Sequence, residues 1–377
     1  MRAPTVWVHS PGCQLGAATV LMQMGIHRSN LAHLANLCYG RHHMSVINNY
    51  HCEITVAQHC NLSCRACTHL SPLLSKDFVD PETLRSDLTT MAKYYHTKYA
   101  RLLGGEPLLH PNILSIIAVV RESGISDRVE VITNGLLLWK MSDEFWKAVN
   151  RVMVSVYPGK EMTPKQVRTC YKKARRHGTR LTMAIVDEFR ESYSEVGTKD
   201  TSLIKRLYRT CLIVNCHNIE KGFFFKCPQS VFLPRALNTK FRSPQIDGIK
   251  IVDSPSFGEE LRAFLASPYP LASCKHCLGA AGKKISHSQV PRSKWRQLQE
   301  SKSEDMVDYE LLSAMEKQPA WEAYTRARPR PYYHISSRRQ LLAYIKRKYG
   351  IFEYLSTLFD LMSSSKEVLE ARFRSAQ

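Results

Sequence analysis

The sequence predicts an α/β protein whose core is a parallel β-sheet. Between residue 52 and about residue 190, short apolar runs rich in β-branched residues alternate with segments of helical periodicity. This alternation is typical of successive βα units, in which each helix returns the chain to a parallel neighbouring strand. A chain of 377 residues can also bury a substantial core and is long enough for more than one structural unit.

The elements of this core can be placed from local signals. Residues 80–98 should open a helix, because Asp80 suits the N-cap position and Pro81 the first helical position. A second helix within residues 110–124 should end at Gly124, since glycine commonly follows the last helical turn. The expected strands are residues 52–57, 100–105, 128–133, 151–157 and 180–186.

The sequence pattern changes near residue 211. Residues 211–228 predict a β-hairpin that turns at Lys221 and Gly222, followed by a short helix within 255–268. The last 90 or so residues contain helix-like segments, with a proline-rich interruption at 326–333. The expected units are an N-terminal extension (1–51), the core (52–210), a hairpin and helix domain (211–285) and a basic helical C-terminal extension (286–377).

The chain is basic and has no segment that resembles a membrane span. Its 53 lysines and arginines against 33 acids give a net charge of +20, which suits a phosphorylated or acidic small substrate. Nucleic-acid binding is the less favoured explanation of that charge. No apolar run approaches the roughly 18 residues that a span requires, and no secretion signal is recognised, so we expect a cytoplasmic protein.

The twelve cysteines are unevenly distributed, which favours metal ligation over a disulfide framework. Eight of them lie in groups. The isolated cysteines are expected to be buried core residues, and they are Cys13, Cys38, Cys52 and Cys170.

The first group, Cys60, Cys64 and Cys67, lies in the loop directly after the first expected strand. A structural zinc site uses four ligands in a closed tetrahedron, and no fourth cysteine is nearby. An iron-sulfur cluster held by only three thiolates leaves one iron with an open coordination position. On these cysteines alone, a partial zinc site and another type of redox cluster remain as alternatives.

The C-x3-C-x2-C spacing after a first strand resembles the radical S-adenosylmethionine (radical SAM) superfamily. The resemblance implies a partial (β/α)6 TIM-like barrel in which the three thiolates hold a 4Fe-4S cluster and SAM chelates the fourth iron. It also implies reductive cleavage of SAM to a 5′-deoxyadenosyl radical, which abstracts a hydrogen atom from a substrate. Flavodoxin or ferredoxin would be the electron donor.

Three further motifs match this family. "GGEP" at 104–107 resembles the SAM-binding motif, so the resemblance implies SAM contacts from Gly104, Gly105 and Glu106. Asn134 in "TNG" and Ser155 in "VSVYP" lie where the family places polar contacts to SAM, although Asn134 and the glycine after it are also ordinary turn residues. All these motifs end expected strands, and ligand sites of parallel sheets form at the carboxyl ends of the strands.

The second group of cysteines resembles the SPASM extension of that family, or its shortened twitch form. Gly222 separates the first two cysteines in the required order, and a distal C-x2-C pair follows. A zinc ribbon is the alternative. The resemblance implies an auxiliary 4Fe-4S cluster held by Cys211, Cys227, Cys274 and Cys277.

Cys216 makes this assignment ambiguous, because five thiols compete for four positions. In a tight hairpin it could replace Cys211 as a ligand. The thiol left over is either a buried residue or a hydrogen-atom donor to a substrate radical. His217 beside it is expected to be a core or surface histidine and not a ligand.

The resemblance favours a carbohydrate or aminocyclitol substrate that is dehydrogenated or epimerised in a biosynthetic pathway. A ribosomally made peptide is the alternative, but about 50 residues before the first strand are short for a leader-binding domain. A cysteine-rich zinc or nucleic-acid-binding protein would explain the charge but not GGEP. Residues 287–292 are suggested to lie at the rim of the active site.

Overall fold

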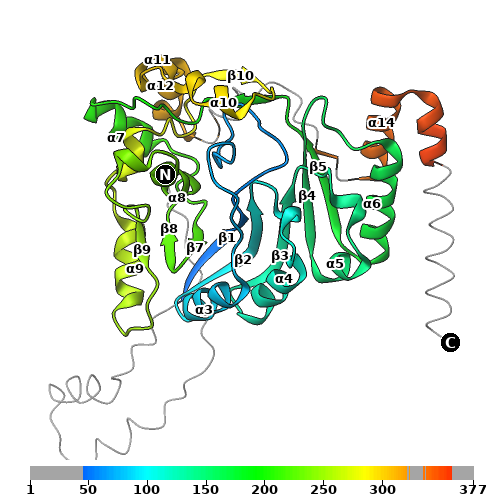
Figure 1. Ribbon diagram of the computed structural model, residues 1–377, viewed down its shortest axis with the longest axis horizontal. Coiled ribbons are helices and arrows are strands. Elements are labelled where there is room, and N and C mark those ends of the chain that lie inside the picture. The colour runs from blue at the N-terminus through cyan, green and yellow to red at the C-terminus, as the bar shows by residue number, and fades with distance from the viewer. Residues whose placement is uncertain (1–45, 321, 323–333, 336, 359–377) are drawn as a thin grey trace, which may run out of the picture. The chain divides into compact units, whose positions relative to one another are not determined.

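The computed structural model describes residues 46–320, 322, 334, 335 and 337–358 (Figure 1). The proline-rich stretch 326–333, Cys13 and Cys38 lie outside the described residues. Among the residues described, no helix combines the length and the apolar character that crossing a membrane requires.

Five consecutive parallel strands form the centre of a nine-stranded sheet. The five predicted strands are confirmed, and in sheet order each pairs with the next along the chain. The first strand begins before the expected domain boundary at residue 52. The bounds are β1 Ile47–Ala57, β2 Tyr95–Gly104, β3 Ser126–Thr133, β4 Arg151–Val156 and β5 Arg180–Ile185.

Helices connect these strands and bury their apolar sides against the sheet. The predicted starts and stops are confirmed at two positions: Asp80 accepts a hydrogen bond from the backbone N–H of Thr83 at 2.8 Å, and Gly124 follows its helix with φ of 72°. Cys52 and Cys170 are buried in this core, as expected. The helices are α3 Pro81–Met91, α4 Ile113–Glu122, α5 Asp143–Ala148 and α6 Pro164–Arg176.

The helical prediction for residues 80–98 is wrong at its C-terminal end. Helix α3 stops at Met91, and β2 begins at Tyr95. The Tyr95 side chain is fully buried against His217 and Phe224 of the hairpin region. Tertiary packing therefore overrides the local helical preference here.

The regular strand and helix alternation ends after β5, which corrects the expected six units. Strand β6 (Glu188–Arg190) pairs with β10 (Lys284–Ser286) in a separate two-stranded sheet. The place beside β5 is taken by β11 (His334–Ile335), which runs antiparallel to it. On the side of β1 away from β2, β7 (Asn218–Glu220) pairs with β1 as a further parallel strand.

The predicted hairpin is confirmed as β7 and β8 (Phe223–Phe225), and β9 (Gly248–Lys250) pairs with β8. Both turn residues have positive φ, 48° at Lys221 and 78° at Gly222, as a tight hairpin turn requires. The remaining helices are α7 Thr201–Arg209, α8 Pro228–Ala236, α9 Phe257–Ala266, α10 Arg292–Trp295, α11 Ser303–Met306, α12 Tyr309–Lys317 and α14 Arg338–Tyr349. Short 3-10 turns are η2 Pro107–Leu109, η3 Leu138–Lys140, η4 Asn238–Lys240, η5 Ala272–Lys275 and η6 Gln297–Gln299.

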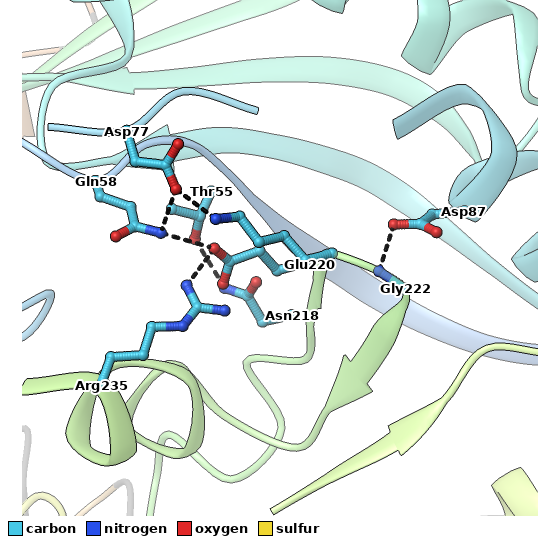
Figure 2. A network of polar contacts seen from close by, with 9 residues as sticks. Thr55, Gln58, Asp77, Asp87, Asn218, Glu220, Gly222 and Arg235 are labelled. Atoms are coloured by element: carbon cyan, nitrogen blue, oxygen red, sulfur yellow. Dashed lines mark hydrogen bonds and ion pairs between the residues drawn. The ribbon is translucent and has the colours of Figure 1, made fainter. Parts of the chain in front are cut away.

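A polar network attaches the hairpin to the end of β1 (Figure 2). Asn218 donates to the Thr55 hydroxyl at 3.5 Å. Glu220 is almost fully buried; its carboxylate pairs with Arg235 and accepts a hydrogen bond from Gln58 at 3.2 Å. Since a buried carboxylate is stable only when it is paired, these contacts determine where β7 lies along β1.

The hairpin turn is also held by the segment between β1 and the end of α3 (Figure 2). Lys221 pairs with Asp77, and the backbone N–H of Gly222 donates to Asp87 at 2.8 Å. The register of β7 against β1 is thereby defined at two points, which matters for the cysteines that flank the hairpin.

Candidate functional site

The first cysteine group lies in the loop after β1, at the carboxyl edge of the parallel strands. All three thiols are free of disulfides, with Cys64 buried and Cys60 and Cys67 half-buried. Burial, together with the charge of the neighbouring Cys67 thiol, raises the pKa of Cys60 and of Cys64 to about 12. Thiols in such surroundings ionise when a metal compensates their charge, so the loop suits a metal centre.

The GGEP loop lies directly against the cysteine loop. The Gly105 N–H donates to the carbonyl of Ala57 at 2.8 Å, and the Glu106 N–H donates to that of His59 at 3.0 Å. A Cβ atom would lie 2.1 Å from the Ala57 oxygen at Gly104, and 2.1 Å from the His59 oxygen at Gly105. Gly104 has φ of 141°, a conformation that favours glycine. The two glycines are therefore needed for contact between the loops.

Glu106 is completely buried and connects the loops after β2 and β3. Its carboxylate accepts hydrogen bonds from the Thr133 hydroxyl at 2.7 Å, from Asn134 N at 2.8 Å and from Leu108 N at 3.0 Å. Burial raises the pKa of Glu106 to about 7, while these hydrogen bonds oppose the shift. A carboxylate has about four acceptor positions, so one remains for the predicted contact with the SAM amino group.

Asn134 extends from the third loop to the first cysteine. Its side-chain amide nitrogen donates to Asn61 Oδ1 at 2.7 Å and lies 3.7 Å from Cys60 Sγ. Asn134 thus contacts the cysteine loop, and its Oδ1 accepts from Leu136 N at 3.0 Å in the turn that the sequence predicts. The loops after β1, β2 and β3 form one hydrogen-bonded unit.

Ser155 and Tyr157 come from the end of β4. Ser155 is half-buried and hydrogen-bonds Tyr157. Burial raises the pKa of Tyr157, and the charges of Cys64 and Cys67 raise it further, so its ring is close to both thiols. Ser155 was the residue singled out in "VSVYP", but the structure brings Tyr157 to the cysteines.

A segment far along the chain covers Cys64. The Nε2 atoms of His287 and Gln289 lie 3.2 and 3.1 Å from Cys64 Sγ. Trp295 donates to the Cys64 carbonyl at 3.0 Å, and the His287 ring stacks on Tyr157 with centroids 4.7 Å apart. The sequence suggested that residues 287–292 lie at the rim of the site, and the structure brings this segment to a predicted metal ligand.

The second cysteine group also converges. The charges of the other three thiols raise the pKa of Cys277 beyond the effect of its burial. Gly279 lies between two members, since its N–H donates to Cys277 Sγ at 3.2 Å and a Cβ there would be 3.7 Å from Cys211 Sγ. The residues brought together are Cys211, Cys227, Cys274 and Cys277, which lie around the hairpin, α8 and η5.

Cys216 faces a different environment. After burial, the charges of Glu53 and Arg101 of the parallel strands affect the pKa of its thiol most, and those of Cys227 and Cys211 affect it less. Its thiol lies within 4.8 Å of ligand atoms of His51 and Glu53. The adjacent His217 is a core histidine, as expected: its Nδ1 contacts the Tyr95 hydroxyl at 2.7 Å, and burial lowers its pKa to about 4.

The fold and the site together define an α/β protein with a cluster of buried and half-buried thiols at the carboxyl edge of a parallel sheet. Residues 54–205 match the family model of the Radical SAM superfamily. The match includes the three cysteines and the GGEP, TNG and VSVYP motifs.

Curated relatives match part of the chain. The GTP 3′,8-cyclase of Trichodesmium erythraeum is 29% identical over 109 residues, which cover 28% of this chain and 33% of the relative. The probable GTP 3′,8-cyclase of Methanothermobacter marburgensis is 34% identical over 104 residues, covering 27% and 33%. The chain therefore spans about a third of the length of these relatives.

Two solved structures have distant similarity to the chain. The structure of BtrN in complex with AdoMet and 2-DOIA has a TM-score of 0.34 and 13% identity, and covers 68% of this chain and 89% of that one. The structure of anSMEcpe with bound AdoMet and a peptide has a TM-score of 0.30 and 17% identity, covering 37% and 44%.

Proposed function

We propose that this protein is a radical SAM enzyme that acts on a small molecule. The observation that carries the proposal is the hydrogen-bonded unit formed by the loops after β1, β2 and β3, within a domain that matches the superfamily. The ligands of a 4Fe-4S cluster are Cys60, Cys64 and Cys67, and the residues that contact SAM are Gly104, Gly105, Glu106, Asn134 and Ser155. Such a cluster, when bound and reduced, supplies the electron that cleaves SAM to a 5′-deoxyadenosyl radical.

The chain's own residues hold and shield this centre. Gln289 donates a hydrogen bond to the sulfur of Cys64, which favours the thiolate form. His287 contacts the same sulfur through Nε2 and stacks on Tyr157, and Cys64 is buried, so little water reaches this sulfur. Hydrogen bonds to the sulfurs and solvent exposure are the protein's means of adjusting the reduction potential of an iron-sulfur cluster.

The first test compares Cys64→Ala with Cys170→Ala. Both variants lose a buried thiol. Cys170 lies on α6, and its thiol contacts Met162 in the core and not the cysteine loop. After anaerobic reconstitution and reduction, we expect the Cys64 variant to form no 5′-deoxyadenosine and the Cys170 variant to form it at the wild-type rate. Full SAM cleavage by the Cys64 variant would refute the assignment.

We also propose an auxiliary 4Fe-4S cluster in a twitch-like domain, held by Cys211, Cys227, Cys274 and Cys277. Their mutual electrostatic influence supports this assignment, and Cys216 is then the thiol left over. Cys227→Ala should lower the iron content by one cluster while SAM cleavage continues. Unchanged iron, or zinc in place of iron at this position, would contradict the auxiliary cluster.

The motif pattern and the curated relatives each suggest a substrate class. A carbohydrate or aminocyclitol, dehydrogenated or epimerised, is the candidate from the motif pattern, with a peptide as its alternative. A purine nucleotide is the second candidate, because the relatives named above are GTP 3′,8-cyclases and the basic surface suits phosphates. Incubating the reduced enzyme with GTP and with aminocyclitols distinguishes them, since the true substrate should accelerate 5′-deoxyadenosine formation. Flavodoxin or ferredoxin is the proposed electron donor.

A further inference from the structure

The pairing of β7 with β1 brings three potential ligand residues to one face of the sheet. Glu53 lies opposite Asn218 in this parallel pair, and the Glu53 N–H donates to the His217 carbonyl at 2.7 Å. Paired residues of neighbouring strands share a face, and side chains two positions away along a strand return to that face. Cys216, two residues before Asn218, therefore lies beside His51 and on the same face as Glu53.

The side chains of these three residues converge on one point. Their ligand atoms, namely a ring nitrogen, a carboxylate oxygen and a thiol sulfur, all lie within 4.8 Å of one another. Both ring nitrogens of His51 and one carboxylate oxygen of Glu53 are buried without any hydrogen-bond partner. A buried polar atom without a partner costs about 1 to 3 kcal/mol, so an occupant at the point where one atom of each residue converges would stabilise groups that the protein leaves unpaired.

The nearby arginines do not take that position. Arg101 is bound through Nε to Glu130 Oε2 at 2.7 Å, and Arg151 is bound to Glu130 Oε1 at 2.9 Å. Among the described residues, no ion pair includes Glu53, although its side chain is buried. A divalent cation held by the Glu53 carboxylate and a Cys216 thiolate forms a neutral unit, and a neutral unit avoids the cost of burying a net charge.

We propose that His51, Glu53 and Cys216 bind a zinc ion at a site separate from both cluster sites. Zinc accepts nitrogen, oxygen and sulfur ligands in one tetrahedron, with bonds of about 2.0 to 2.3 Å. Ligand atoms in such a tetrahedron lie about 3.3 to 3.8 Å apart, so the present separation of up to 4.8 Å closes by roughly 1 Å when the ion binds. Three protein ligands leave a fourth position for water.

This site explains the fifth thiol of the second cysteine group. Cys211 and Cys216 lie on one loop between α7 and β7, and the zinc ion uses the second of them. The ion connects β1 to this loop, which also contains Cys211 of the auxiliary group. Binding is therefore expected to stabilise the placement of Cys211 without requiring SAM cleavage.

The test measures zinc and iron in the full-length, cluster-reconstituted protein after equilibration with ZnCl2 and removal of loosely bound metal. We expect one zinc per chain in the wild type, and at least about tenfold weaker zinc affinity in His51→Ala and in Cys216→Ser, because even an indirect ligand contact is worth that much. Iron content should stay at the wild-type value in both variants. The control is Cys52→Ala, because Cys52 lies between two of the ligands on β1 but faces the apolar core.

Two outcomes overturn the proposal: equal zinc affinity in wild type and the ligand variants, or loss of iron in Cys216→Ser, which would make Cys216 a cluster ligand. Cobalt supplies a second readout that does not depend on stability. The sulfur-to-cobalt charge-transfer band of the wild type should vanish in Cys216→Ser and persist in Cys52→Ala. Formation of 5′-deoxyadenosine in the same preparations reports on the proposed function independently of zinc.

Discussion

Replacing Gly105 with alanine tests the contact on which the candidate SAM site depends. The new methyl carbon would lie 2.1 Å from the His59 oxygen, 2.3 Å from its carbonyl carbon and 2.8 Å from Cys60 N. All three are backbone atoms, so no side-chain rotation relieves the overlap. Real contacts of Cβ atoms essentially never fall below 3.0 Å, so the GGEP and cysteine loops must move about 0.9 Å apart.

The cost follows from the hydrogen bonds that this movement breaks. The bond from Gly105 N to Ala57 O and that from Glu106 N to His59 O are 2.8 and 3.0 Å long. Each contributes about 1 kcal/mol, and a buried group left unpaired costs about 1 to 3 kcal/mol more. We expect Gly105→Ala to lower the free energy of unfolding by about 3 to 5 kcal/mol.

Gly124→Ala is the control, because Gly124 has a left-handed conformation, with φ of 72°, but a Cβ there has no atom within 4 Å. Its expected cost is the left-handed backbone penalty alone, about 1 to 2 kcal/mol. Urea unfolding of the metal-free proteins measures the difference, and iron content after reconstitution should fall only in Gly105→Ala. Equal stability losses in the two variants, with full iron binding in both, would show that the loops do not depend on this contact.

Two further predictions concern buried carboxylates. The pKa of Glu106 is raised from 4.5 to about 7, so its contribution to stability is present below about pH 4.5 and is lost as the pH rises through 7. Over that range the wild type should lose about 3 kcal/mol of unfolding free energy relative to Glu106→Gln. Parallel pH profiles of the two proteins would contradict this prediction. Arg235→Met leaves the buried Glu220 carboxylate without its cation and should cost about 3 to 5 kcal/mol in urea unfolding. Arg85→Met, which removes an exposed pair with Glu122, should cost at most about 1 kcal/mol, and a similar cost for both arginine variants would refute the role of burial.

Features that depend on neighbouring residues were predicted well. The five parallel strands, the Asp80 cap, the stop at Gly124 and the turn at Lys221 and Gly222 all follow from short-range patterns. Each rests on a local energetic preference, such as a cap that satisfies a free N–H or a residue that tolerates positive φ.

Features that depend on distant partners were missed. Residues 95–98 read as helix in the sequence but form β2, because Tyr95 is buried against the hairpin. The place next to β5 is taken by β11 from the C-terminal region instead of a sixth parallel strand. No local pattern reports which segment completes a sheet edge, since that choice depends on packing across many residues.

The candidate site also has features that the sequence predicted and contacts that only the structure shows. Local spacing singled out Cys60, Cys64, Cys67 and the GGEP motif, and the structure places these two loops in contact, with glycines at the closest approach. For residues 287–292 the sequence suggested a place at the rim of the site, but it gave no reason to expect that His287 and Gln289 contact the sulfur of Cys64, more than 200 positions away.

The sequence alone determined the parallel strands of the core and the positions of the thiol groups and strand-end motifs along the chain, since these follow from local patterns. The tertiary structure decided how Glu106 is used, which segment covers Cys64 and where Cys216 points. Cys211 and Cys216 are equivalent by spacing, and only the register of β7 against β1 directs Cys216 toward His51 and Glu53. That register is set by a buried network of long-range ion pairs and hydrogen bonds, whose partners meet only once the chain has folded.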